Sequence, residues 1–360
     1  MSRAPQTRPT AAGAPRAKPL PPGMALRTYR FLRFGVLAVI GALAASRMKE
    51  GVDTGCLQGS ISAYYYTPAR SIFVGALVAI GLVMVSLWGK SFFEDGFLNL
   101  AGLLAPVVAF VPTTESADIR KCAITTSTGG DVTSDKVETA IVTTASHGAV
   151  DNNMLAYLVV VGIVLAAVGV RGWYGRRHGF PELTEHPLAY WVPWATAAAL
   201  WLVGAVVYVV MRDNWMYDHT HTPAAIVLFV FVVLAVIAVG YDKHKGNPEL
   251  GEASNRTWAR IYWGLAGGMT AGAGLVLLLT KVVLPHWWPW WGAHAVFMLE
   301  AWMILGLAVF WVAQTIDRWK DGAPPKTKEE LEKHQAELSA FQAATRDLSD
   351  VTPESSPRSP

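Results

Sequence analysis

The stretch MYDHTHTPAA places one carboxylate and two imidazole groups, Asp218, His219 and His221, within four residues and directly before a long apolar run. Carboxylate and imidazole groups are ligands of zinc, but a zinc site needs three or four of them. Part of the stretch has a simpler explanation, because Thr222 and Pro223 are typical of the first positions of a helix. Two interpretations stay open: a zinc site at Asp218, His219 and His221, or a polar cluster that needs no cofactor.

The motif FMLEAWM places Glu300 about two turns inside the last apolar segment. A carboxylate that faced lipid there would cost about 2.5 kcal/mol or more, so Glu300 must face the interior of a helix bundle. We expect Glu300 and His221 to share one outer-leaflet polar pocket, capped by the segment SISAYYYTPAR. Three roles stay open for Glu300: a buried ion pair that sets helix register, the handling of a substrate or a proton, or burial as a neutral acid. The groups on that side able to donate to the carboxylate are His221, Lys281, Arg70, Tyr64, Tyr65 and Tyr66. At the inner side, Asp95 and Asn99 are the counterpart and suit the start of a helix.

The elements that must position these residues are membrane-spanning helices. The chain of 360 residues is 52% hydrophobic and only 16% charged, whereas soluble domains are about 25% charged. A spanning helix needs roughly 20 mainly apolar residues, because lipid leaves the backbone to bond to itself. The sequence therefore predicts an all-α, polytopic transmembrane helix bundle. Its eight expected spans are residues 31–46, 71–88, 97–113, 154–170, 188–211, 224–241, 261–284 and 293–313.

The Lys and Arg residues predict the orientation of these spans. Basic residues gather before the first segment and in every second connection, and positive residues in short loops stay in the cytoplasm. Both termini are therefore expected to be cytoplasmic in a bacterial-type plasma membrane. Arg47 and Lys49, just beyond the first segment, do not fit this rule. The first segment also has an alternative interpretation as a cleaved secretory signal.

Three regions follow from this organisation. Residues 1–30 are basic and Pro-rich, and we expect them to be disordered. Residues 31–320 form the bundle, with extracytoplasmic loops at 47–70 and 114–153. Residues 321–360 are expected to hold a cytoplasmic amphipathic helix and a disordered tail. The only two cysteines, Cys56 and Cys122, fall in the two outer loops, so we predict a disulfide between them; the alternative is two separate thiols.

Three glycines, Gly264, Gly268 and Gly272, recur at intervals of four in the seventh segment. This spacing puts them on one helical face and lets another helix backbone approach closely. The partner is expected to be a neighbouring helix of the same chain, with a dimer as the alternative.

Three quoted segments carry a family resemblance: the stretch from SISAYYYTPARSIF to LAPVVAFVPT, HTPAAIVLFVFVVL and WWGAHAVFMLEAWMILGLAVFW. Together they resemble a group of uncharacterised actinobacterial-type multi-pass membrane proteins and, more distantly, the six-helix autophagy-modulator and Sfk-type membrane proteins. The resemblance implies a His before an apolar helix, matched by His221, and an acid in the last helix, matched by Glu300. It implies no settled activity, and this chain departs from it by an extra hairpin at residues 154–211.

Three classes of function remain compatible with these features. The favoured one is a non-enzymatic membrane protein that binds lipids or joins an envelope complex, as a homo-oligomer or with a protein partner. The second is a metal-dependent lipid amidase or hydrolase similar to the alkaline ceramidases, with Ser60 or Ser62 acting beside Asp218 and His221. The third is a small-solute or proton-coupled transporter centred on Glu300. No phosphate-binding glycine motif points to ATP, and nothing points to a nucleic acid partner.

Overall fold

The computed structural model describes residues 22–87, 89, 91–113, 137–180, 183, 187–211, 214–246, 253–284 and 290–319, and the single residues 332, 336 and 339. Every regular element within this part of the chain is helical. The elements are α1 (Pro22–Thr54), η1 (Ser62–Tyr66), α2 (Arg70–Ser86), α3 (Phe92–Phe110), α5 (Val137–Arg177), α7 (Pro187–Val210), α8 (Asn214–His219), α9 (His221–Lys245), α10 (Arg256–Leu278), the π-helical turn η3 (Leu279–Val283), α11 (Trp290–Ala293) and α12 (Ala295–Asp317).

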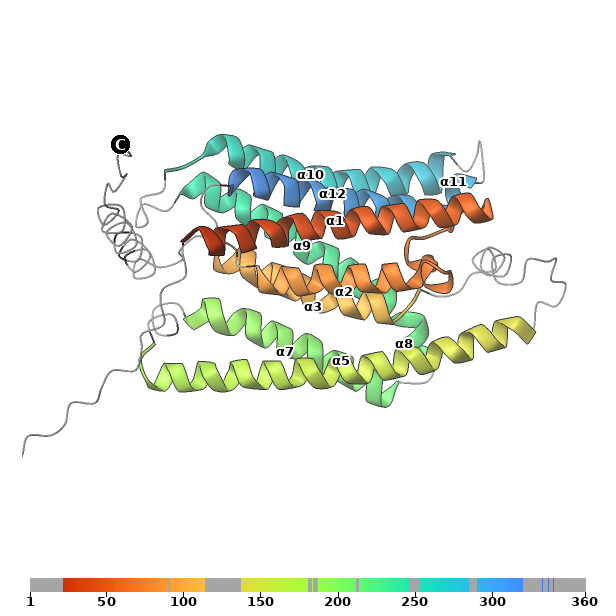
Figure 1. Cartoon of the computed structure of the whole chain (residues 1–360), viewed down its shortest axis with the longest axis horizontal. Helices are drawn as coiled ribbons and strands as arrows, with labels where there is room; N and C mark the ends of the chain where they lie inside the picture. Colours follow the sequence, from red (N-terminus) through yellow and green to blue (C-terminus); the bar gives the residue numbers. More distant parts are fainter. Residues whose placement is uncertain are drawn as a thin grey trace, which may run out of the picture.

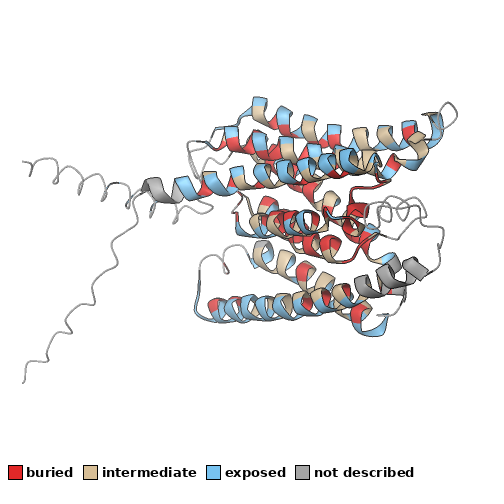
Figure 2. Cartoon of the chain, turned by 45° about the vertical axis from the view of Figure 1, so that its right-hand side comes forward, coloured by how far each residue is buried: buried red, intermediate tan, exposed pale blue. Residues whose placement is uncertain are grey.

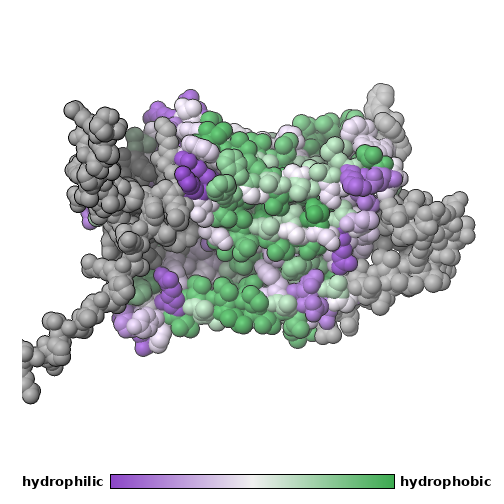
Figure 3. Space-filling view, in the orientation of Figure 1, coloured by the Kyte–Doolittle hydropathy of each residue, from purple (hydrophilic) through white to green (hydrophobic). Residues whose placement is uncertain are grey.

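Seven helices are long and apolar enough to cross a membrane: α1, α3, α5, α7, α9, α10 with η3, and α12. The eighth expected span corresponds to α2, which is apolar but has only 17 residues. On the face seen in Figure 3, hydrophobic residues cover the middle of the molecule and hydrophilic residues gather toward its two ends. The chain is therefore a multi-pass helical membrane protein. Its exact number of crossings, its sidedness and its plasma-membrane location stay predictions. We use "outer end" for the end that holds Thr54, η1 and the start of α9.

Two helices extend beyond the expected boundaries. Helix α1 begins at Pro22, within the segment expected to be disordered, and ends at Thr54, within the expected loop 47–70. Helix α5 begins at Val137, within the expected loop 114–153. The apolar pattern marks only the part of a helix that suits lipid, whereas the backbone hydrogen bonds continue into polar sequence.

Several expectations fall outside the described residues. These include Cys122, the first 21 residues and almost all of the region 321–360. The Cys56–Cys122 disulfide, the disordered N-terminal segment and the amphipathic C-terminal helix therefore stay predictions.

The helices form a core bundle with a hairpin beside it (Figure 1). Helices α1, α2, α3, α9, α10 and α12 pack in the bundle, while α5 and α7 pack on each other and contact the bundle through α3. Among the seven membrane-length helices, α3 is the most enclosed. Of the 18 residues in its most apolar stretch 56% are buried, against 17% for α5 and 11% for α7. Figure 2 shows the same contrast between a buried centre and an exposed hairpin. The apolar outer faces of α5 and α7 suit contact with lipid.

Helices α2 and α3 approach each other closely at Gly81 and Gly102. A Cβ atom built on either glycine would lie 2.7 Å from the main-chain oxygen of the other.

The expected contacts of the α10 glycines are found only in part. A Cβ on Gly272 would meet the Trp302 side chain, but Gly264 and Gly268 have no neighbour within 4 Å at that position. Spacing alone does not tell which glycine face meets a helix, because that depends on how the helix is rotated.

We expect Gly102→Val to destabilise the protein by about 1–3 kcal/mol, because overpacking forces the α2 and α3 backbones apart. The measurement is the thermal unfolding midpoint of the purified protein in detergent. Gly264→Val is the matched control, since it makes the same change of helix propensity at an open position. Equal destabilisation by both changes would contradict a specific α2–α3 contact.

Candidate functional site

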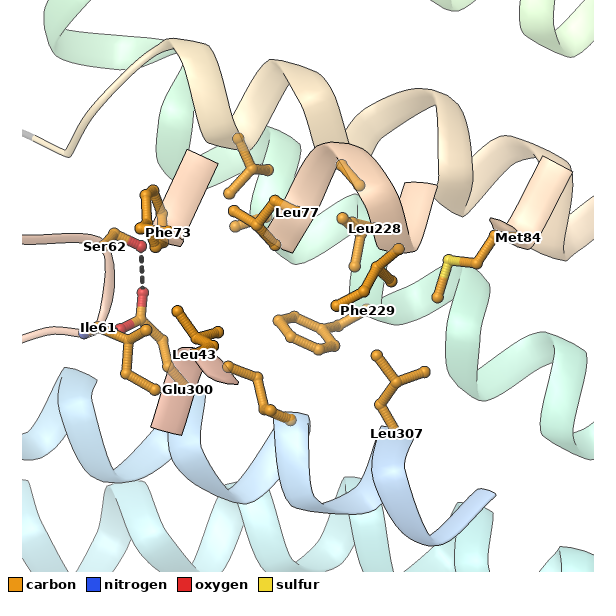
Figure 4. A pocket seen from close by; sticks show the side chains of 15 residues that line it. Leu43, Ile61, Ser62, Phe73, Leu77, Met84, Leu228, Phe229, Glu300 and Leu307 are labelled. Carbon is orange, nitrogen blue, oxygen red and sulfur yellow. Dashed lines mark hydrogen bonds between the residues drawn. The ribbon is translucent and has the colours of Figure 1, made fainter. Parts of the chain in front are cut away.

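Glu300 and His221 meet at the outer end of the bundle through a third residue, Ser62. The Ser62 hydroxyl lies 2.7 Å from Glu300 Oε1 and 2.8 Å from His221 Nε2. The Ile61 main-chain N–H donates to Glu300 Oε2, and His221 Nδ1 lies 2.6 Å from the Val111 carbonyl oxygen. We call these five residues the outer polar cluster. Figure 4 shows Glu300 and Ser62 pointing toward each other.

Local structure between α1 and α2 presents Ser62 to the bundle. The Ser60 hydroxyl accepts from the Ala63 N–H at 3.1 Å and so caps the short helix η1. The chain before it is fixed on α12, because the Phe297 N–H donates to the Gly59 carbonyl at 2.9 Å. A Cβ on Gly59 would lie 3.0 Å from the Ala293 carbonyl oxygen, so this approach favours glycine. Ser62 is consequently only 4% exposed.

The other expected donors do not reach Glu300. The Arg70 guanidinium donates to the Tyr65 hydroxyl at 2.5 Å and lies over the Tyr65 ring, and the Tyr66 hydroxyl donates to the Thr113 carbonyl at 2.9 Å. Lys281 Nζ lies 3.4 Å from the Gly292 carbonyl oxygen. Tyr64 is fully buried beside Arg47. The Ile61 main-chain N–H, just before η1, and the Ser62 hydroxyl bind the carboxylate instead of these side chains.

Burial raises the pKa of the Tyr64 and Tyr65 hydroxyls. Both phenols therefore stay protonated at neutral pH, and the rim of the site gains no negative charge from them.

Arg47 is the functional candidate that the sequence did not reveal. Its guanidinium carbon lies 5.5 Å from the Tyr64 ring centroid and 5.0 Å from that of Phe297, and its charge attracts the Glu300 carboxylate. The sequence did contain one indication of this role, because Arg47 does not fit the rule that basic residues stay on the cytoplasmic side. A basic residue on the outer side, combined with an acid in the same leaflet, indicates an electrostatic partner.

The zinc interpretation receives no support from this geometry. Both ring nitrogens of His221 are already engaged, and His219 is exposed. The Asp218 side chain lies outside the described residues. Among those that are described, no group of three or more His, Cys, Asp or Glu side chains is placed to hold a metal ion.

Ser62 and His221 have the spacing of a nucleophile and its base, as a hydrolase would require. The second side of the Ser62 hydroxyl, however, is held by Glu300, and the pair is closed off from solvent. Ser60, the other expected nucleophile, is engaged in capping η1. The hydrolase interpretation stays a prediction.

A cavity of about 60 Å³ lies below the outer polar cluster. Ser62 and Glu300 are the polar residues of its wall, and the rest is apolar (Figure 4). The wall comes from α1, α2, α3, α9 and α12, and includes Phe73, Met84 and Leu307. The cavity has room for a few water molecules, but only its outer end offers them hydrogen-bond partners.

A second buried polar cluster, the inner ion network, lies at the opposite end of the bundle. Glu94 accepts from Arg318 Nη2 at 2.6 Å and from Gln314 Nε2 at 2.7 Å. Gln314 in turn accepts from Arg33 Nη1 at 3.1 Å. All four side chains are at least 95% buried. Asp95 lies in the first turn of α3, as expected of an acid at a helix start, and Asn99 follows in the same helix. The buried acid at this end, however, is Glu94.

A lateral slot lies between the α5–α7 hairpin and the core bundle, beside their contacts with α3. It consists of two adjoining cavities of about 290 Å³ and 650 Å³. Leu103, Tyr157, Val161 and Ala197 line both cavities. The walls are largely apolar. Asp95 and Asn99 line the larger cavity, and His219 and Thr220 line the smaller one.

Comparisons with models of protein families, with curated proteins and with solved structures give no match for this chain. The resemblance to actinobacterial-type and Sfk-type membrane proteins stays a prediction.

Proposed function

We propose that the protein is a lipid-binding membrane protein that holds a hydrocarbon chain in the lateral slot. The observation that carries this proposal is the slot itself, which runs between two packed groups of helices that are each able to span a membrane. Its volumes, about 290 Å³ and 650 Å³, fall near the range of roughly 300–1,000 Å³ that is common for ligand pockets.

The hairpin wall of the slot is built to keep its shape. The Trp201 and Trp194 indole N–H groups on α7 donate to the Leu158 and Leu165 carbonyls on α5, at 2.7 Å and 2.9 Å. A Cβ on Gly162 would collide with Trp201, so small residues on α5 admit these rings. These bonds hold α5 and α7 to each other along the wall of the slot.

The chemistry of the lining selects the occupant. Apolar side chains form nearly all of the wall, and the polar ring atoms of Trp194 and Trp201 already have partners. A hydrocarbon chain fills such a space without leaving polar groups unpaired, whereas water would find few partners there. Asp95 and Asn99 near the start of α3, and His219 and Thr220 before α9, place polar groups toward the two ends. The Tyr157 and Tyr190 hydroxyls also belong to the lining, but they donate to the Leu103 and Val168 carbonyls.

The test compares two tryptophan substitutions on α5. Val161→Trp fills the part of the slot that both cavities share, while Ile163→Trp adds the same bulk to a position that is 64% exposed on the outside. Native mass spectrometry of the protein released from phospholipid nanodiscs counts the lipids that stay bound. We expect Val161→Trp to lose one bound lipid relative to the wild type and Ile163→Trp to keep it. The same lipid count in all three proteins would overturn the proposal.

A further inference from the structure

The hydrogen-bond partners of His221 determine where one of its protons lies. The Val111 carbonyl oxygen can only accept, and His221 Nδ1 lies 2.6 Å from it, so Nδ1 carries a hydrogen. Nε2 is then either a bare acceptor, in the neutral ring, or a second N–H donor, in the imidazolium. The Ser62 hydroxyl faces Nε2 in both cases.

Ser62 has a single hydroxyl hydrogen and stands between two groups that can each give or take a proton. When His221 is neutral, this hydrogen points to Nε2, and the Ser62 oxygen accepts from a protonated Glu300. When His221 is an imidazolium, Nε2–H donates to the Ser62 oxygen, whose hydrogen points to an ionised Glu300. In both arrangements each hydrogen shared among Ser62, Glu300 and His221 has an acceptor.

We propose that Glu300, Ser62 and His221 form a proton-sharing site that holds one exchangeable proton. The two arrangements interconvert when the Nε2 proton moves to Ser62 Oγ while the Ser62 hydroxyl proton moves to Glu300 Oε1. No bond between heavy atoms changes, and the total charge is conserved. Ser62 is a positioning residue that connects the acid to the base.

Losing or gaining a proton breaks the pairing. Without the shared proton, the single Ser62 hydrogen must serve two acceptors, and one of them is left unpaired. With a second proton, both neighbours donate to Ser62, and its own hydrogen has no acceptor within the trio. An unpaired buried polar group costs about 1–3 kcal/mol, so the one-proton state is preferred over a wide range of pH.

The surroundings of the trio contain few competing groups. The end of α3 supplies main-chain carbonyls to His221, from Val111 and Val108, and neither of them titrates. Arg47 attracts the Glu300 carboxylate and lies near two aromatic rings. Its charge therefore influences whether the proton lies on Glu300 or on His221, but an arginine side chain does not itself release a proton. His294 is bonded to two main-chain carbonyls and has no carboxylate partner. The ionisable groups of the neighbouring elements at this end include Arg47, Lys49, Glu50, Asp53, Tyr64, Tyr65, Tyr66, Arg70, His219 and His294.

The test is a pH titration of the His221 ring nitrogens, followed by NMR in the full-length protein in nanodiscs. The histidines are labelled with ¹⁵N, and the His221 signal is the one that disappears in His221→Gln. Ser62→Ala removes the connection and Glu300→Gln removes the proton acceptor. We expect each change to move the midpoint of the His221 titration by at least one pH unit. Ser62→Thr keeps the hydroxyl and should retain the wild-type curve. The ring-nitrogen signals of His294, which bonds two main-chain carbonyls, serve as the internal control and should be the same in all four proteins.

Identical His221 curves in the wild type, Ser62→Ala and Glu300→Gln would overturn the proposal. Covalent labelling of Ser62 by a fluorophosphonate would also overturn it, because Ser62 would then be an activated nucleophile and not a link between acid and base. If Ser62→Ala fails to fold, Glu300→Gln and Ser62→Thr still give opposite expectations.

Discussion

Glu94→Leu is expected to destabilise the protein by about 3–5 kcal/mol, because removing one partner of a buried ion pair leaves the other charge uncompensated. Glu94 is completely buried and accepts from both Arg318 and Gln314. Its loss would leave the Arg318 guanidinium, which is 5% exposed, without a counter-charge in the inner ion network. The free energy of unfolding, measured by denaturation in mixed micelles, checks the prediction.

Two controls separate the charge from the packing. The double variant Glu94→Leu with Arg318→Leu removes both charges, so we expect it to recover part of the lost stability. Lys49→Ala breaks the pair of Lys49 with Asp53, whose side chains are 76% and 52% exposed, and should leave stability unchanged. A double variant that is less stable than Glu94→Leu would contradict the explanation.

Glu300→Leu is expected to cost about 2–4 kcal/mol, because each orphaned buried donor costs about 1–3 kcal/mol. The substitution leaves the Ile61 N–H without an acceptor and takes one of two partners from the Ser62 hydroxyl. Glu300→Gln keeps an oxygen for these donors and should cost less than half as much. Thermal unfolding in detergent at neutral pH compares the two variants.

The effect should also appear locally. The segment from Gly59 to Tyr66 is fixed to α12 through Glu300 and through the bond from the Phe297 N–H to the Gly59 carbonyl. Hydrogen exchange of the Ile61 amide should therefore speed up in Glu300→Leu and change little in Glu300→Gln. Equal protection of this amide in both variants would show that the carboxylate does not hold the segment.

Much of the architecture could be predicted from the sequence. Long apolar segments specify membrane-length helices, because a backbone in lipid must satisfy its own hydrogen bonds, and all eight expected segments lie on helices. The same reasoning placed Glu300 inside the bundle, since a carboxylate facing lipid is costly. Its depth below the outer end, together with the position of His221 at the start of α9, brought the two residues to one end of the molecule.

Only the tertiary structure decided which residue connects Glu300 to His221. Ser62 lies between Glu300 and His221 because η1 turns its hydroxyl into the bundle, and no pattern in the sequence separates Ser62 from Ser60. Glu94 and not Asp95 became the buried acid, because the rotation of α3 about its axis sets which of two neighbouring residues meets Arg318. Gly81 and Gly102 became the close contact instead of Gly264 and Gly268 for a similar reason. Hydrophobicity and length are properties of a segment by itself, whereas a contact depends on the rotation and depth of two helices together.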